Sequence, residues 1–209
     1  MHLTCLAIAA CALAAAPASP PPRGGGAAGD PRPKVEAYLA ANDVPAAADL
    51  AALASAPEKP LMAIATDAKA DGLLRARAVA ALRLVPSPEV GAFLFKLIAA
   101  KAKASEATDR LIVRRAAVAL GWMAGPGTPE QLALLFDNED AEVRLDAVIG
   151  LGLTRATAAP ILLRRQLAVE PVARVREQIE RQLRALGQVA PEAEKPVRAK
   201  EQQPMRSGF

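Results

Sequence analysis

The stretch DNEDAEVRLDAVIGLG, residues 137–152, joins an acidic turn to an amphipathic helix pattern. Four of its first six residues are acidic. Beyond them, apolar side chains recur at spacings of three and four residues, whereas Arg144 and Asp146 fall off that stripe. The pattern predicts a helix that follows an acidic turn and buries one face. The apolar positions of that face are Val143, Ala147, Val148 and Leu151.

The same pattern occurs elsewhere in the chain. Copies start at residues 45, 74, 112, 143 and 175, so successive starts lie 29, 38, 31 and 32 residues apart. The copies read LRARAVAALR (74–83), IVRRAAVALG (112–121) and VREQIERQLR (175–184), with a weaker one over 45–53. A recurrence at this period is typical of stacked structural repeats, in which each unit buries its apolar face against the next.

A second helix is expected after most copies, because its start signal also recurs. Pro60, Pro88, Pro129 and Pro160 each open a short apolar run. Proline is well suited to the first helical turn, where its missing N–H has no intrahelical partner. Ser87 and Thr128 precede two of these prolines and are the residue types that cap helix N-termini. The sequence therefore predicts an all-α fold, an α-solenoid of four to five stacked antiparallel helix pairs over residues 34–187.

Composition agrees with closely packed helices and narrows the class of partner. The chain is 52% hydrophobic but only 3% aromatic, and small alanine side chains allow helices to approach one another. A formal charge of +4, from 26 basic and 22 acidic residues, does not indicate a nucleic-acid partner. A protein partner is the expectation.

The segment LLFDNEDAEVRLDAVIGLG, residues 134–152, resembles HEAT repeats, in particular the short type found in phycobilisome lyase proteins. The resemblance covers roughly residues 45–187. It implies that Asp137 and Arg144 form a structural ladder pair, with Asp71 and Arg75 as a looser counterpart. The copy at 112 departs from the pattern, since Val113 and not arginine follows Ile112. HEAT proteins differ widely in function, so the resemblance implies a fold and leaves the partner open.

The two ends of the chain differ from the repeats. Residues 1–18 hold an uncharged apolar run and are typical of a bacterial export signal, 19–33 of a Pro/Gly linker, and 188–209 of a disordered charged tail. Ile8 to Cys11 resembles a lipobox, so Cys11 is a candidate lipidation site. Simple secretion, a lipid anchor and a buried N-terminal helix remain alternatives. The predicted localisation is the periplasm or the exterior, with a membrane contact only through lipidated Cys11.

The repeats carry little catalytic chemistry. His2 is the only histidine, and both cysteines, Cys5 and Cys11, precede the repeats. We therefore predict a protein that is not an enzyme and that needs no cofactor or metal, with a lyase-type enzyme subunit as the alternative. The acidic turn at 137–140 lacks the ligand spacing of a calcium loop and is interpreted as a helix cap.

Two surfaces are candidate binding sites. Lysines and arginines on the second helices form either a basic groove for a partner or only the solvent-exposed side of these helices. Trp122 lies off the apolar stripe of its helix, as either an inter-repeat contact or an exposed anchor. Phe95 presents the same choice on the helix from Pro88. The candidate binding residues are Phe93, Phe95, Lys96, Trp122, Arg164 and Arg165, and the structural residues are Asp137, Arg144 and Leu151.

Overall fold

The computed structural model describes residues 29–42, 45–125 and 127–187, and in these ranges it is all-helical, with no strand. The predicted export signal, Cys11, most of the linker and the charged tail lie outside the described residues. No helix in the described ranges is long and apolar enough to cross a bilayer. The helices are α1 (Arg32–Ala41), α2 (Ala47–Leu53), α3 (Glu58–Thr66), α4 (Gly72–Ala81), α5 (Pro88–Lys101), α6 (Ala107–Met123), α7 (Thr128–Ala133), α8 (Ala141–Thr154), α9 (Ala159–Val169) and α10 (Ala173–Ala185), with 3₁₀ turns at Leu82–Leu84 and Leu134–Asp137.

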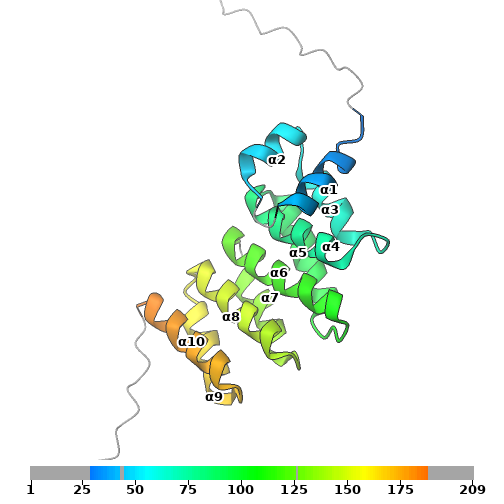
Figure 1. Ribbon diagram of the computed structural model, residues 1–209. Coiled ribbons are helices and arrows are strands. Elements are labelled where there is room, and N and C mark those ends of the chain that lie inside the picture. Colours follow the sequence, from blue (N-terminus) through cyan, green and yellow to red (C-terminus); the bar gives the residue numbers. More distant parts are fainter. Residues whose placement is uncertain (1–28, 43–44, 126, 188–209) are drawn as a thin grey trace, which may run out of the picture.

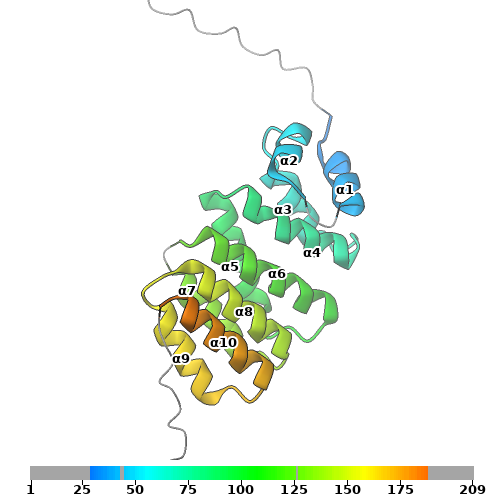
Figure 2. The same cartoon turned by 60° about the vertical axis from the view of Figure 1, so that its left-hand side comes forward.

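The helices lie in two layers, which the sequence copies distinguish (Figure 1). Helices α4, α6, α8 and α10, which hold the four strong copies, pack side by side and form the first-helix layer. The runs opened by proline become α3, α5, α7 and α9, the second-helix layer, and each packs on the first-layer helix next to it. Figure 2 shows α6, α8 and α10 running alongside one another in front of α7 and α9. At the N-terminal end α1 packs on α3 and α4, and α2 on α1.

Small residues bring α6 and α8 nearly into backbone contact. A Cβ atom on Gly121 would lie 2.3 Å from the carbonyl oxygen of Gly150. A Cβ atom on Gly150 would lie 2.4 Å from the carbonyl oxygen of Ala117. Neither side of this crossing has room for a side chain. Leucine, isoleucine and valine fill the space between the layers instead, and Leu151 is fully buried, as its place on the apolar stripe predicts.

Side-chain caps set the starts of several helices. Ser87 Oγ accepts a hydrogen bond from the Val90 N–H at 3.1 Å, which confirms its predicted role. The prediction for Thr128 was wrong. Gly127, at φ +75°, is the N-cap of α7, a conformation that glycine adopts at no steric cost. Thr128 lies in the first turn, and its hydroxyl accepts from the Gly125 N–H.

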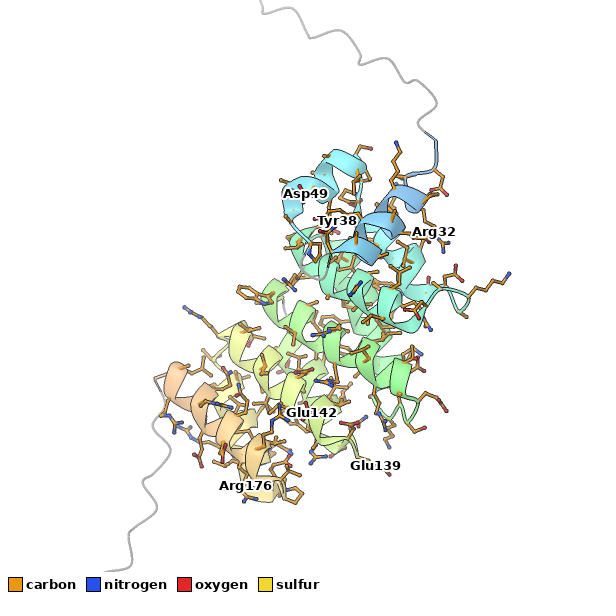
Figure 3. The ribbon with its side chains drawn as sticks, viewed as in Figure 1. Arg32, Tyr38, Asp49, Glu139, Glu142 and Arg176 are labelled. Atoms are coloured by element: carbon orange, nitrogen blue, oxygen red, sulfur yellow. The ribbon has the colours of Figure 1, made fainter. Side chains whose placement is uncertain are left out.

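Polar contacts hold helix α1 against its neighbours α2 and α3. Helix α1 begins at Arg32, two residues inside the predicted 19–33 linker. Arg32 forms an ion pair with Glu36 at 2.6 Å and another with Asp67 at the end of α3. On the other side, the Tyr38 hydroxyl donates to Asp49 of α2 at 2.7 Å, and the two side chains point toward each other in Figure 3. The contacts of Arg32 hold the first turn of the helix, which lies inside the Pro-rich stretch.

Candidate binding surfaces

A buried ion pair joins two turns at the C-terminal end of the stack. Nε and Nη2 of Arg144 donate to the two carboxylate oxygens of Glu170, at 3.0 and 2.7 Å. Nη1 donates to the carbonyl oxygens of Asn138 and Glu139. Glu170 is 3% exposed, and Gln166 and the Val172 N–H also donate to it. Arg144 thus holds the turn before α8 to the turn before α10.

The ladder pair implied by the family resemblance was therefore wrong in its acidic member. Asp137 is exposed at the end of a 3₁₀ turn, whereas Arg144 reaches across to Glu170 in the following turn. The Asp71 and Arg75 pair was also wrong. Asp71 caps α4 through the N–H groups of Leu73 and Leu74, and Arg75 donates to the carbonyl of Ala65. Sequence spacing located the arginine but not the turn in which its partner lies.

Acid should weaken the fold through Glu170. Burial alone would raise the pKa of this carboxyl, but the hydrogen bonds from Arg144, Gln166 and the Val172 N–H lower it below the ordinary value of about 4.5. A lowered folded-state pKa gives stability that is present above 4.5 and is lost as the pH falls through the folded pKa. We expect urea melts from pH 7 down to pH 3.5 to show a steeper loss for wild type than for Glu170→Gln. Equal slopes would contradict the prediction.

The cap of α8 is Asp140 rather than Asp137. Asp140 Oδ1 accepts from the Glu142 N–H at 2.8 Å, and Asp140 pairs with Arg110 at 3.1 Å. We expect Asp140→Ala to lower the free energy of unfolding by about 1 kcal/mol, as loss of an N-cap does. Asp137→Ala, three residues away, is the matched control and should stay within about 0.5 kcal/mol of wild type. Thermal melts of both variants test this, and an equal loss in both would contradict it.

A row of ion pairs crosses the first-helix layer. Arg114 of α6 pairs with Asp146 at 2.8 Å and with Glu142 at 3.2 Å. Glu142 of α8 also pairs with Arg174 of α10 at 2.6 Å, and Figure 3 shows it on the side of α8 that faces α10. Burial raises the pKa of Asp146 more than Arg114 lowers it. These carboxylates are held within the layer, near the N-terminal ends of its helices.

The second-helix layer exposes cations together with apolar side chains. Lys96, Arg164 and Arg165 are exposed, as the sequence predicted. Ile161 and Val169 of α9 are 61% and 71% exposed, and Leu134 after α7 is 49% exposed. Sequence reasoning missed these three because each stands in an apolar run, where neighbouring positions are buried.

The two phenylalanines of α5 are half-buried and pack against the core. Phe95 lies beside Gly127 and lines a pocket of about 320 Å³ with Leu120 and Met123. Its own carbonyl accepts from Gln131 Nε2 at 2.8 Å. Phe95 is therefore an inter-repeat contact rather than an exposed anchor.

Trp122 is the largest exposed apolar side chain, at 62%. It follows Arg115 and Val118 on the outer side of α6, at helical spacing. On the parallel α8, Ile149 and Leu153 occupy the repeat positions that Val118 and Trp122 occupy on α6. Since the glycine crossing brings these helices together, their outward apolar side chains lie on neighbouring ridges. Of the two alternatives for Trp122, the structure therefore agrees with the exposed side chain and not with a packed contact between repeats.

A pocket of about 380 Å³ adjoins this surface. Three arginines of α4, its 3₁₀ turn and α6 line it together with apolar side chains. Arg77 donates to the carbonyl oxygens of Leu39 and Ala40 at the end of α1. The pocket residues are Pro45, Leu73, Ala76, Arg77, Ala80, Arg83 and Arg115.

The acidic turn forms a small polar pocket of about 310 Å³ with Lys103 and Arg110. Within the described ranges, no group of three or more histidine, cysteine or acidic side chains is arranged to hold a metal ion.

No family model, no curated protein and no solved structure matches the chain.

Proposed function

We propose that the chain is an exported HEAT-like α-solenoid that binds a protein partner as a scaffold module, without catalysis of its own. The pairing of helices into two layers supports the solenoid, because each pair packs on the next as stacked repeats do. The ion pairs that join α6, α8 and α10 are compatible with the HEAT resemblance, although the partners differ from those it implies.

The observation that carries the binding function is the exposure of Trp122. A tryptophan that is 62% exposed keeps a large apolar area in water, and such side chains are frequent energetic centres of protein interfaces. Val118 and Leu153 on the same side are also partly exposed. Exposed Ile161 and Val169 mark the second-helix layer as the other candidate face.

The lyase-type alternative is less well supported by the side chains at hand. Residues 29–187 contain no histidine and no cysteine, the usual general bases and nucleophiles of such chemistry. Arginines and carboxylates dominate the polar contacts of the first-helix layer, and they pair with one another.

Affinity capture from the native host tests the function and separates the two faces. Bait proteins are wild type, Trp122→Ala, and Lys96→Glu/Arg165→Glu on the second-helix layer. We expect a partner that wild type captures and that Trp122→Ala loses, with circular dichroism melts showing both variants folded. A partner lost only with Lys96→Glu/Arg165→Glu would move the site to the second-helix layer. Capture of no specific partner by wild type would contradict the function.

Export and anchoring are tested at the N-terminus. We propose cleavage before Ser19 or before Ala15, with lipidation of Cys11 as the alternative suggested by Ile8 to Cys11. Mass spectrometry of protein from the host should find a shortened chain. A mature N-terminus at an acylated Cys11 would establish the lipoprotein, and an intact Met1 would contradict export.

A further inference from the structure

We infer that the outer side of α4, α6 and α8 binds an acidic segment of the partner protein that carries an apolar anchor residue. This inference rests on the proposed binding function and names the chemistry of the partner. The surface concerned, called the Trp122 face, consists of Arg83, Arg115, Val118, Trp122 and Leu153.

Charge complementarity indicates an acidic ligand. The stretches 72–88, 110–125 and 147–169, which include the C-terminal parts of α4, α6 and α8, contain arginines and no aspartate or glutamate. The nearby carboxylates, Glu142 and Asp146, are already paired with Arg114. Arg83 and Arg115 have no ion pair within the described part of the chain. Negative charge on a ligand would meet the guanidinium groups of Arg83 and Arg115 there.

The cationic residues of this face are arginines, and that chemistry suits carboxylates. A guanidinium group presents a planar fork that can hold both oxygens of one carboxylate, whereas a lysine ammonium acts as a point charge. Arg83 and Arg115 line one pocket together with the apolar side chains of Leu73, Ala76 and Ala80. The pocket therefore fits an acidic side chain whose methylene groups would contact these apolar side chains.

The apolar half of the face requires an apolar counterpart. Trp122 is seven residues, two helical turns, beyond Arg115 on the same side of α6, so the two lie about 10 Å apart along the helix axis. An extended peptide rises about 3.3 Å per residue, so three residues span that distance. A ligand with a large apolar residue about three positions from a glutamate or aspartate would contact both groups.

The same features argue for a polypeptide over nucleic acid. Tight binding to a phosphate backbone draws on a track of several cations, and the chain has a formal charge of only +4. Val118 and Leu153 beside Trp122 are aliphatic, and they find a match in an aliphatic or aromatic side chain rather than in a sugar–phosphate chain. Nucleic acid and anionic membrane are kept as arms of the test.

Selection from a random twelve-residue peptide display library, with the full chain as bait, tests the inference. We expect enriched peptides with net negative charge and a Phe, Leu or Trp two to four positions from an acidic residue. A synthetic copy of the dominant peptide is then titrated while tryptophan emission is followed. Trp122 is the only tryptophan, so a blue shift and reduced acrylamide quenching report directly on this face.

Matched variants assign the site. Arg83→Glu/Arg115→Glu and Trp122→Phe/Val118→Asp are each expected to weaken peptide binding at least tenfold. Lys96→Glu/Arg165→Glu makes the same charge change on the second-helix layer and should stay within twofold of wild type. For variants without tryptophan, binding is read by anisotropy of a labelled peptide. Folding is verified from each melting curve, and Arg115→Gln alone, with an expected severalfold loss, replaces the double variant if that variant is unfolded.

The outcomes separate this inference from the proposed function. If the enriched peptides are basic or uncharged, the ligand is not acidic. If acidic peptides keep their affinity for Arg83→Glu/Arg115→Glu, the ligand does not bind at this face. Either result overturns the inference and leaves the proposed binding function standing. Tighter binding of a 20-nucleotide single-stranded DNA, or of vesicles of phosphatidylcholine with one quarter phosphatidylglycerol, overturns the polypeptide ligand. If the selection enriches no peptide at all, the inference is overturned. If the host also yields no captured partner, the proposed binding function is contradicted as well.

Discussion

Gly121→Val is expected to lower the free energy of unfolding by about 3 kcal/mol, the upper end of the usual cost of overpacking, since the crossing has no space for a side chain. The added Cβ would come within 2.3 Å of the Gly150 carbonyl oxygen and 2.6 Å of its Cα. Because the obstacle is backbone, no rotamer change relieves the overlap, and α6 and α8 must separate. Urea melts followed by circular dichroism measure the loss.

A second glycine provides the control. Gly91, inside α5, has room for a methyl group, since the nearest atom to its Cβ position is the end of the Met123 side chain at 3.7 Å. Gly91→Ala should stabilise the protein by about 0.5 to 1 kcal/mol through helix propensity. A loss below 1 kcal/mol for Gly121→Val would contradict the close crossing.

Arg144→Met should cost about 3 to 5 kcal/mol, because it leaves the Glu170 carboxylate buried without its cation. The loss should shrink as the pH falls, because burial without Arg144 raises the pKa of Glu170 and protonation then removes the unpaired charge. Arg115→Met, on the neighbouring helix and exposed, is the control and should change stability by less than about 0.5 kcal/mol. The double variant Arg144→Met/Glu170→Leu should recover part of the loss. An Arg144→Met protein as stable as the control would show that the pair contributes nothing to the fold.

Local sequence patterns predicted the helices well because each signal acts within a few residues. The apolar stripe around Leu151, the Ser87 cap and the prolines at helix starts all concern contacts inside one helix or one turn. The same local signals also predicted which helices form each layer. The four strong sequence copies became one set of helices, and the apolar runs that begin with proline became the other. The solenoid arrangement itself, and its HEAT character, remain proposals.

Contacts between turns were predicted poorly. The choice of Asp137 for Arg144 relied on nearness in sequence, while the structure pairs Arg144 with Glu170, 26 residues further on. An arginine side chain is long enough to reach the next turn, and which carboxylate it meets depends on how two helix pairs are stacked. The exposure of Trp122 and Ile161 also depends on how the helices are stacked. An apolar residue off the main stripe is buried or exposed according to whether a neighbouring helix covers it.

Contacts between near neighbours in the stack also set the order in which the molecule should open. Among the described helices, those in substantial contact are at most three apart in chain order, with the most extensive packing between α6 and α8. Amide hydrogen exchange should therefore be slowest in these two helices and fastest in α1 and α2, because the end can fray while the middle stays closed. Measured protection that is uniform along the chain would mean that the stack opens only as a whole. A gradient would make the terminal pairs the first points of entry for proteases and would leave the tryptophan-bearing centre folded the longest.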